Sequence, residues 1–395
     1  MTIVFWTALG LVVYTYVGYG IVLYLLVRAK RLIKGRPEPA SGTYEPEVTL
    51  LVAAYNEKDY AARKVENTRQ LDYPAEKLKQ VWITDGSDDG TPDLLRQYED
   101  VTVLHQDARN GKIAAMNRGM QLVDTPIVVF SDANTLLGKE SIRRIVNLFE
   151  RPTTGCVSGE KRIRTGEAEA AAGAGEGLYW RYESTLKKWD AELYSVVGAA
   201  GELFAVRTEL YQHVEPDTLL DDFIVSLRIA KRGYTIQYDP EAYAIETASA
   251  NVQEELKRKI RIAAGGIQSI VRLAPLLNIF QYGILSFQYI SHRVLRWTLA
   301  PLTLPVIFIS NALLWNQGLI YQFLFLGQVA FYAAALLGWY LEHRRIKLKL
   351  LFVPYYFFIM NYAVYRGFGR YLARKQDVRW ERARRGDAVA GLEGK

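Results

Sequence analysis

Histidine and cysteine are scarce in this sequence, which has four histidines and one cysteine, Cys156, among 395 residues. A single cysteine cannot form an internal disulfide, so we expect no disulfide-stabilised fold. The four histidines are scattered and make no ligand pattern, so we expect no zinc site. Internal repeats and low-complexity tracts are also absent from the sequence.

Charged residues are absent from residues 2–27. This run is long enough to cross a bilayer as a helix. A cleaved signal peptide would carry basic residues before its apolar run. Here the basic residues follow the run: Arg28, Lys30, Arg31, Lys34 and Arg36. Because positive charge stays on the cytoplasmic side, we expect residues 1–36 to be a transmembrane anchor with a basic flank and an outside amino end.

A second stretch without charge covers residues 297–341. It is about twice the length of one span, and Asn316-Gln317-Gly318 is typical of a turn in its middle. We therefore expect two helices, at about 297–315 and 319–341, that form a membrane hairpin.

Three further segments border this hairpin. The run 350–365 is apolar but short, contains Pro354 and ends in Tyr365-Arg366-Gly367, so we expect a re-entrant or interfacial element rather than a crossing. Residues 271–296 are expected to form an amphipathic segment at the interface. The tail, residues 366–395, has nine basic and four acidic residues and is expected to stay in the cytoplasm.

The net charge of +7 has two possible explanations. A nucleic-acid-binding protein carries its basic residues on a folded face or motif, beside base-reading elements. In this chain many basic residues border the apolar runs, which indicates contact with anionic lipid. We therefore expect membrane lipids, and no nucleic acid, among the partners.

Short apolar runs alternate with helical stretches between the membrane segments, which is typical of an α/β domain with a mostly parallel sheet. A linker at 37–46 precedes this domain, which we place at 47–270. Its first predicted strands are 48–54, 80–84, 101–104 and the apolar run that begins at Ile127.

Asp132 and Asn134 follow this last run, with one small residue between them. Ligands bind beyond the carboxyl ends of strands in open α/β sheets. Two oxygen ligands two positions apart on an extended segment can point toward one hard cation. The alternative is an Asx turn that ends the strand.

Over residues 46–268 the chain resembles the family 2 glycosyltransferases, inverting enzymes with the fold called GT-A, and its membrane segments fit the polysaccharide-synthase branch. The motifs that carry the resemblance are Ala53-Ala54-Tyr55-Asn56-Glu57, Thr84-Asp85-Gly86-Ser87-Asp88-Asp89-Gly90-Thr91, Asn110-Gly111-Lys112 with Asn117, Asp132-Ala133-Asn134, the glycine segment 197–207 and Leu220-Asp221-Asp222. Ala53 stands where the family has proline, and Thr84 where it has aspartate.

The resemblance implies a nucleotide-diphospho-sugar donor, most often a UDP-sugar. The residues expected to bind it are Tyr55, Asn56, Glu57, Asp85, Lys112 and Asp132. Lys112, near a helix start, can add a point charge to the phosphates. Turn formation with Gly86 is the alternative for Asp85.

Transfer requires that the leaving pyrophosphate be neutralised, which a divalent cation does as a Lewis acid. Asp132 and the neutral Asn134 are the expected ligands. Their weak affinity suits Mg²⁺ or Mn²⁺ held largely by the substrate's phosphates. The acceptor hydroxyl must also lose its proton, and we assign Asp222 as that base. The alternative is that Asp222 belongs to the acidic first turn of a helix.

The acceptor or product side is expected to include Gly201, Asp221, Arg258 and Arg261. Arg261 fits the Gln-x-x-Arg-Trp motif of the long-chain synthases, whereas Arg258 and Ile262 replace its Gln and Trp; the alternative for the arginines is contact with the membrane. Trp380 and Arg385 resemble the gating-loop pair of hyaluronan-type synthases, or else belong to a basic tail on anionic lipid.

The sequence thus predicts a multi-pass cell-membrane enzyme whose cytoplasmic domain adds sugar to a carbohydrate or lipid-linked acceptor. A processive synthase that extrudes its polymer competes with a transferase that adds one sugar; the few expected crossings favour separate export partners. A catalytically dead sugar-binding scaffold is the rival from another class. Thr84 and Asn134 favour that scaffold, whereas the presence of Asp85, Asp132 and Asp222 together argues against it.

Overall fold

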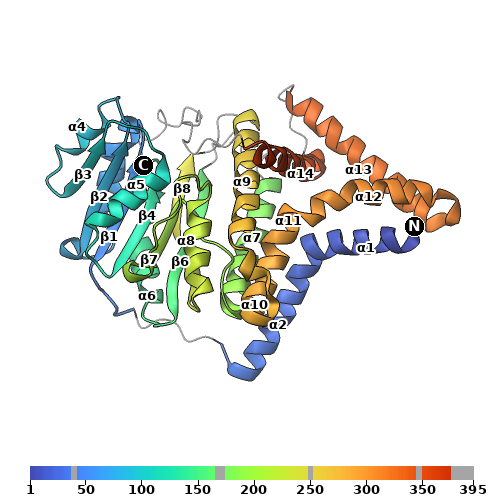
Figure 1. Ribbon diagram of the computed structural model, residues 1–395, viewed down its shortest axis with the longest axis horizontal. Coiled ribbons are helices and arrows are strands. Elements are labelled where there is room, and N and C mark those ends of the chain that lie inside the picture. The colour runs from blue at the N-terminus through green and yellow to red at the C-terminus, as the bar shows by residue number, and fades with distance from the viewer. Residues whose placement is uncertain (37–41, 165–173, 248–251, 344–348, 375–395) are drawn as a thin grey trace.

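A computed structural model describes residues 1–36, 42–164, 174–247, 252–343 and 349–374. An α/β domain around one mixed sheet forms one part, and long helices extend away from it on one side (Figure 1). The strands are β1 (Val48–Ala54), β2 (Leu78–Asp85), β3 (Val101–Gln106), β4 (Ile127–Asp132), β5 (Leu136–Leu137), β6 (Thr154–Arg164), β7 (Leu203–Arg207) and β8 (Thr235–Thr247).

The sheet has the order β3-β2-β1-β4-β7-β6-β8-β5. Strands β3, β2, β1 and β4 run parallel to one another, as do β6 and β8, whereas β7 and β5 are antiparallel to their neighbours. Every residue of β1 is buried, as expected for a parallel strand covered on both faces. The predicted fold and the four predicted strands are confirmed.

Helices cover both faces of the sheet. One face packs against α3 (Lys58–Arg69), α4 (Thr91–Leu95) and α6 (Ser141–Leu148), and the other against α5 (Lys112–Gly119) and α8 (Asp221–Lys231). Side chains of β1 alternate between these two cores, with Leu50 in one and Leu51 in the other.

The position of β1 between β2 and β4 fixes where a ligand can bind. The chain leaves β1 for β2 on one side and reaches β4 on the other, so the carboxyl end of β1 is a topological switch point. Ala53 of β1 lies beside Asp132 of β4 in the ladder. The strand ends therefore bring residues 55–57, Asp85 and Asp132 to one edge.

The helical part begins with one long helix, Thr2–Lys34, made of α1 (Thr2–Val13), a π-helical turn (Tyr14–Gly18) and α2 (Tyr19–Lys34). It and Leu319–Leu341 are long and apolar enough to cross a membrane. The predicted hairpin helices are present as α12 (Leu299–Leu313) and α13 (Leu319–His343), joined by a turn that ends at Gly318.

The segment before the hairpin is helical as well. It contains a 3-10 turn (Ala274–Leu277), α10 (Ile279–Tyr289), a π-helical turn (Ile290–Val294) and α11 (Leu295–Trp297). The helices of 279–297 meet α12 at an angle of 55°, so that together they resemble a broken span or a re-entrant loop. The interfacial placement of 271–296 stays a prediction.

The last apolar run is longer than the sequence predicted. Instead of a short element ending at Tyr365, the structure has one helix, α14 (Lys349–Leu372), that packs against α9 (Val252–Arg272) and α13. Pro354 lies inside it and does not end it. Gly367 does not end it either, because it lies against α9: a Cβ there would be 2.7 Å from that of Ala263.

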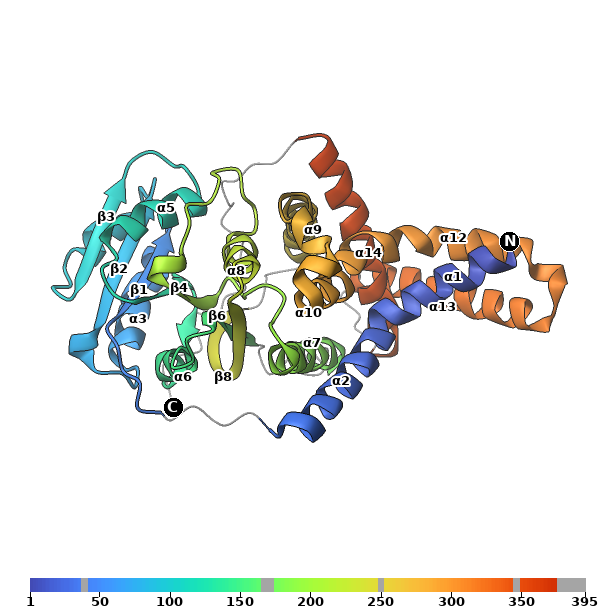
Figure 2. The same ribbon diagram turned by 60° about the horizontal axis from the view of Figure 1, so that its bottom comes forward.

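The amino-terminal helix packs against the α/β domain and makes hydrogen bonds to it. Helix α2 packs beside α7 (Ala174–Leu193) (Figure 2). Lys30 Nζ donates to the carbonyls of Glu192 (2.6 Å) and Leu193 (2.8 Å), the last residues of α7. Tyr19 of α2 donates to the buried Asp190 of α7.

Asp190 also joins α7 to the segment before the hairpin. It accepts a hydrogen bond from Gln288 Nε2 at 2.9 Å, and its second carboxylate oxygen lies 2.6 Å from His292 Nδ1. All three side chains are buried. Three segments far apart in the sequence therefore meet at one carboxylate.

Candidate functional site

The loop after β1 is joined to the loop after β2. Asn56, at φ 52°, donates from its side chain to Asp88 (2.8 Å) and accepts from the Asp88 backbone N–H (3.0 Å). The Tyr55 ring lies under the guanidinium of Arg109, 3.7 Å from the ring centre. Glu57 is buried. Asn56 thus sets the relative position of the two loops.

Asp85, at the end of β2, holds the loop that precedes α5. Its Oδ2 accepts from the backbone N–H groups of Asn110 (2.9 Å) and Gly111 (2.7 Å). Gly86 has φ +72°, and a Cβ there would lie 2.7 Å from that of Arg109, so this turn requires glycine. In the structure Asp85 therefore positions the start of α5. Its predicted contact with the nucleotide stays a prediction.

Lys112 is the first residue of α5 and lies between two carboxylates. Its Nζ is 2.8 Å from Asp132 Oδ1 and 3.4 Å from Asp221 Oδ2. Burial alone would lower the pKa of this ammonium, but Asp132 and Asp221 outweigh burial and keep the pKa above its ordinary value. Lys112 is therefore a permanent positive charge at the ligand edge of the sheet.

Asp132 and Asn134 occupy a tight turn at the end of β4, in which Thr135 Oγ1 donates to the carbonyl of Asp132 at 2.9 Å. Asn134 Oδ1 is buried and has no hydrogen-bond partner among the residues that the structure describes. A carboxylate beside a buried amide oxygen that no described protein group satisfies fits a hard cation such as Mg²⁺ or Mn²⁺.

Lys64, which sequence reasoning missed, supports this turn from behind. Its buried Nζ donates to Ser131 Oγ and to the Thr135 carbonyl, both at 2.8 Å. Burial lowers the pKa of Lys64 to about 7, with Asp132 acting in the opposite direction. A signal was available: Lys64 lies on the core face of α3 with Ala61, Val65 and Thr68, where a lysine needs a buried partner.

Asp222 lies in the first turn of α8, and its Oδ1 accepts from the Phe223 N–H at 2.8 Å. Burial, and then the carboxylate of Asp221, raise the pKa of Asp222 to about 7; Lys112 opposes them and Glu202 adds to the increase. Gly201 lies against it, since a Cβ at Gly201 would be 3.1 Å from Asp222 Oδ2. A carboxyl with a pKa near neutrality is suited to accept a proton.

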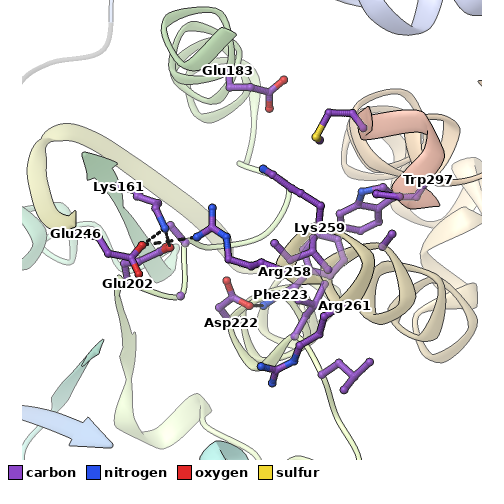
Figure 3. A pocket seen from close by; sticks show the side chains of 18 of the residues that line it. Lys161, Glu183, Glu202, Asp222, Phe223, Glu246, Arg258, Lys259, Arg261 and Trp297 are labelled. Atoms are coloured by element: carbon purple, nitrogen blue, oxygen red, sulfur yellow. Dashed lines mark hydrogen bonds and ion pairs between the residues drawn. The ribbon is translucent and has the colours of Figure 1, made fainter. Parts of the chain in front are cut away.

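A cluster of ion pairs lies beside Asp222 (Figure 3). Lys161 pairs with Glu202 at 2.5 Å and with Glu246, and Arg258 of α9 lies 3.6 Å from Glu246. Sequence reasoning predicted Arg258 but not Lys161, Glu202 or Glu246. Glu202 lies in the predicted glycine segment 197–207, but no motif marks Lys161 or Glu246. The three side chains meet only because β6, β7 and β8 lie side by side in the sheet.

One cavity of about 920 Å³ joins most of these groups. The predicted site residues that line it are Glu57, Lys112, Asp132, Asn134, Gly201, Asp221, Asp222, Arg258 and Arg261. Tyr55, Asn56 and Asp85 lie in or under the loops at its edge and are not among its lining residues. Trp380 and Arg385, predicted on the acceptor side, lie outside the described residues.

Residues 46–265, more than half of the chain, match the family model described as glycosyltransferase like family 2. The chain belongs to this family. Two curated relatives illustrate its range. Poly-beta-1,6-N-acetyl-D-glucosamine synthase of Staphylococcus aureus is 25% identical over 233 residues, which are 57% of this chain and 56% of the relative. Beta-monoglucosyldiacylglycerol synthase of Synechocystis sp. is 30% identical over 270 residues, 62% of this chain and 54% of the relative.

This glycosyltransferase spans about half the length of these curated relatives. Its fold is similar to that of a solved structure, the mannosyltransferase PcManGT from Pyrobaculum calidifontis in complex with GDP-Man and Mn²⁺. The TM-score is 0.71 at 22% identity, with 94% of this chain and 99% of the other covered. The predicted GT-A fold is confirmed.

The glycosyltransferase should show a pH profile that depends on Glu202. If deprotonated Asp222 is the base, transfer increases as pH rises through the Asp222 pKa, about 7. Glu202→Gln removes a negative charge that raises this pKa, so the acidic limb of kcat/KM should move to lower pH. Glu246→Gln is the matched control, because Glu246 pairs with the same Lys161 but is not among the charges that shift Asp222. An unshifted profile for Glu202→Gln would contradict Asp222 as the titrating base.

Proposed function

We propose that this glycosyltransferase moves a sugar from a nucleotide-diphospho-sugar, most simply a UDP-sugar, to an acceptor hydroxyl with inversion at the sugar carbon. One observation carries this proposal: a single cavity contains two chemically different places. The first is the edge with Lys112 and Asp132, and the second is the carboxyl of Asp222, whose pKa is about 7. The first suits a diphosphate, and the second suits removal of one proton. Inversion needs only one such carboxylate.

The residues present fit Mg²⁺ or Mn²⁺. Asp132 offers a carboxylate and Asn134 an orphaned amide oxygen. No group of three or more His, Cys, Asp or Glu side chains that could hold a metal occurs within the described ranges. Two protein ligands imply that phosphate oxygens would complete the coordination. When bound, the ion would supply Lewis-acid neutralisation of the departing diphosphate.

The protein's own groups have separate roles in this mechanism. Lys112 places a fixed positive charge where the diphosphate leaves, and the neighbouring carboxylates hold its ammonium in position. Asp222 takes the proton from the acceptor hydroxyl as that oxygen attacks the sugar carbon from the face opposite the diphosphate. The buried ion pairs of Lys161, Glu202 and Glu246 fix the wall beside Asp222.

We further propose that the catalytic domain faces the cytoplasm of a multi-pass cell-membrane protein. The basic end of the long amino-terminal helix, at Arg28, Lys30 and Arg31, lies on the domain side, which agrees with the positive-inside tendency. The names of the relatives cover both a polysaccharide and a glycolipid, and both product classes are included in this proposal.

The decisive experiment supplies the purified full-length protein, in lipid, with a panel of radiolabelled nucleotide sugars and either Mg²⁺ or Mn²⁺. We expect one donor to be consumed and its sugar to appear in product with the opposite anomeric configuration, as read by NMR. Retained configuration would exclude the single-displacement mechanism. Failure to bind or consume any donor would favour the scaffold.

A further inference from the structure

The cavity continues from Asp222 to a wall of different chemistry. At the sheet edge it is lined by charged groups such as Lys112 and Asp132, whereas its other end is lined by α14. The α14 residues there are predominantly apolar: Phe352, Val353, Tyr356, Phe357, Met360, Ala363 and Val364. A donor of sugar and phosphate does not need this apolar wall, so it is available to another ligand.

Helix α14 lies between α9 of the α/β domain and the candidate membrane helix α13 (Figures 1 and 2). It packs against α13, whose outward side chains are largely exposed and apolar. Val353 lines the cavity and is also 58% exposed. The apolar end of the cavity therefore reaches the molecular surface next to a helix suited to contact lipid.

Polar side chains lie between these two ends. From Asp222, contacts run through Phe223 to Trp297, whose ring lies 5.2 Å from that of Phe223, and on to Arg293, stacked on Trp297. Arg293 and Arg296 both pair with the buried Glu183. The N–H groups of such guanidiniums can donate to ligand oxygens such as those of esters.

The same polar region contacts α14 through the amino-terminal helix. Tyr16 donates to Asn361 of α14 at 2.9 Å, and its ring makes an edge contact with Phe357 at 5.1 Å. The order of groups along the cavity is therefore a base, then polar donors, then aromatic and aliphatic side chains. This order matches an amphiphile with a hydroxyl at its polar end.

We propose that the acceptor is a glycerolipid with a free hydroxyl, which enters from the α14 end and presents that hydroxyl to Asp222. Its ester oxygens lie beside Arg293 and Arg296, and its chains lie on α14. A bond forms between the lipid oxygen and the sugar carbon, the bond from that carbon to the diphosphate breaks, and Asp222 receives the hydroxyl proton. This inference rests on the proposed transferase function and selects its acceptor.

The test uses the full-length protein in nanodiscs with the donor identified from the panel. Dioleoylglycerol, a polyprenyl phosphate and a soluble oligosaccharide are offered separately, and labelled product is partitioned into organic solvent. We expect label on dioleoylglycerol. Met360→Trp, which fills the α14 end, should lower this transfer by about tenfold or more while UDP binding in the presence of Mn²⁺ is retained.

Leu326→Trp is the matched control, since Leu326 is an exposed apolar residue of α13 outside the cavity. This variant should transfer sugar at the normal rate. Val353→Trp, at an exposed position, provides a second blocking variant if Met360→Trp does not fold. Two results would overturn the glycerolipid assignment while leaving the transferase function in place. One is label found only on the oligosaccharide or the polyprenyl phosphate, and the other is full transfer to dioleoylglycerol by both blocking variants. A protein that consumes no donor with any acceptor would instead remove the transferase function on which the assignment rests.

Discussion

Asp222→Asn should lower sugar transfer by roughly 10²–10⁴-fold, the usual contribution of a general base, while donor binding stays nearly intact. Asparagine keeps the shape and the hydrogen bond from Phe223 N–H but cannot accept the hydroxyl proton. Asp222 is not within ion-pairing distance of Lys112 in the structure, whereas Asp132 and Asp221 are, so the donor end of the cavity should keep its charge pairing.

The measurement is single-turnover transfer together with UDP binding by calorimetry. Asp217→Asn is the control: this aspartate precedes the same helix but is exposed and pairs with Arg272. Full transfer activity in the Asp222→Asn variant would contradict the assignment of Asp222 as the base.

Asp132→Ala should act on the donor instead. Loss of this carboxylate removes the only charged member of the Asp132–Asn134 pair and frees Lys112 from its closest partner, 2.8 Å away. We expect donor binding to lose its dependence on Mn²⁺ and transfer to decrease by about 10²–10³-fold, as for the loss of one electrostatic group at a reacting centre.

Titration of UDP with and without Mn²⁺ measures this effect. Asp124→Ala is the control, because Asp124 precedes the same strand, is exposed and pairs only with Lys79 among the residues described. If Asp132→Ala kept the wild-type metal dependence, the cation would have to bind elsewhere.

How far the sequence predicted this site depends on how local each signal is. Strand β1 is apolar except for Thr49, and β4 starts with a continuous apolar run. The polar residues after both strands are local in sequence, so the strands and their end loops were predictable. The α5 start at Lys112 was predictable for the same reason. Lys161, Glu202 and Glu246 were not, since their pairing is created by contacts between three strands.

The helical part shows the same limit. Gly367 and Pro354 are local helix-breaking signals, and they predicted a short element. The close packing of Gly367 on Ala263 in α9 overrides the first of them, and α14 continues to Leu372. Tertiary contact of this kind leaves no periodic pattern in the sequence.

The carboxylate of Asp190 has a practical consequence for anyone who wishes to crystallise the catalytic domain by itself. A shortened chain that begins after the linker would lose Tyr19 and Lys30, leaving Asp190 without one of its donors and the last turn of α7 without its lysine cap. Losing a hydrogen bond to a charged group costs about 1.5–3 kcal/mol, a sizeable fraction of the roughly 5–15 kcal/mol that stabilises a typical domain. Solubility gained by deleting the apolar helix would therefore be offset by lower stability of the remaining domain, and the better route is the intact protein in a lipid mimetic.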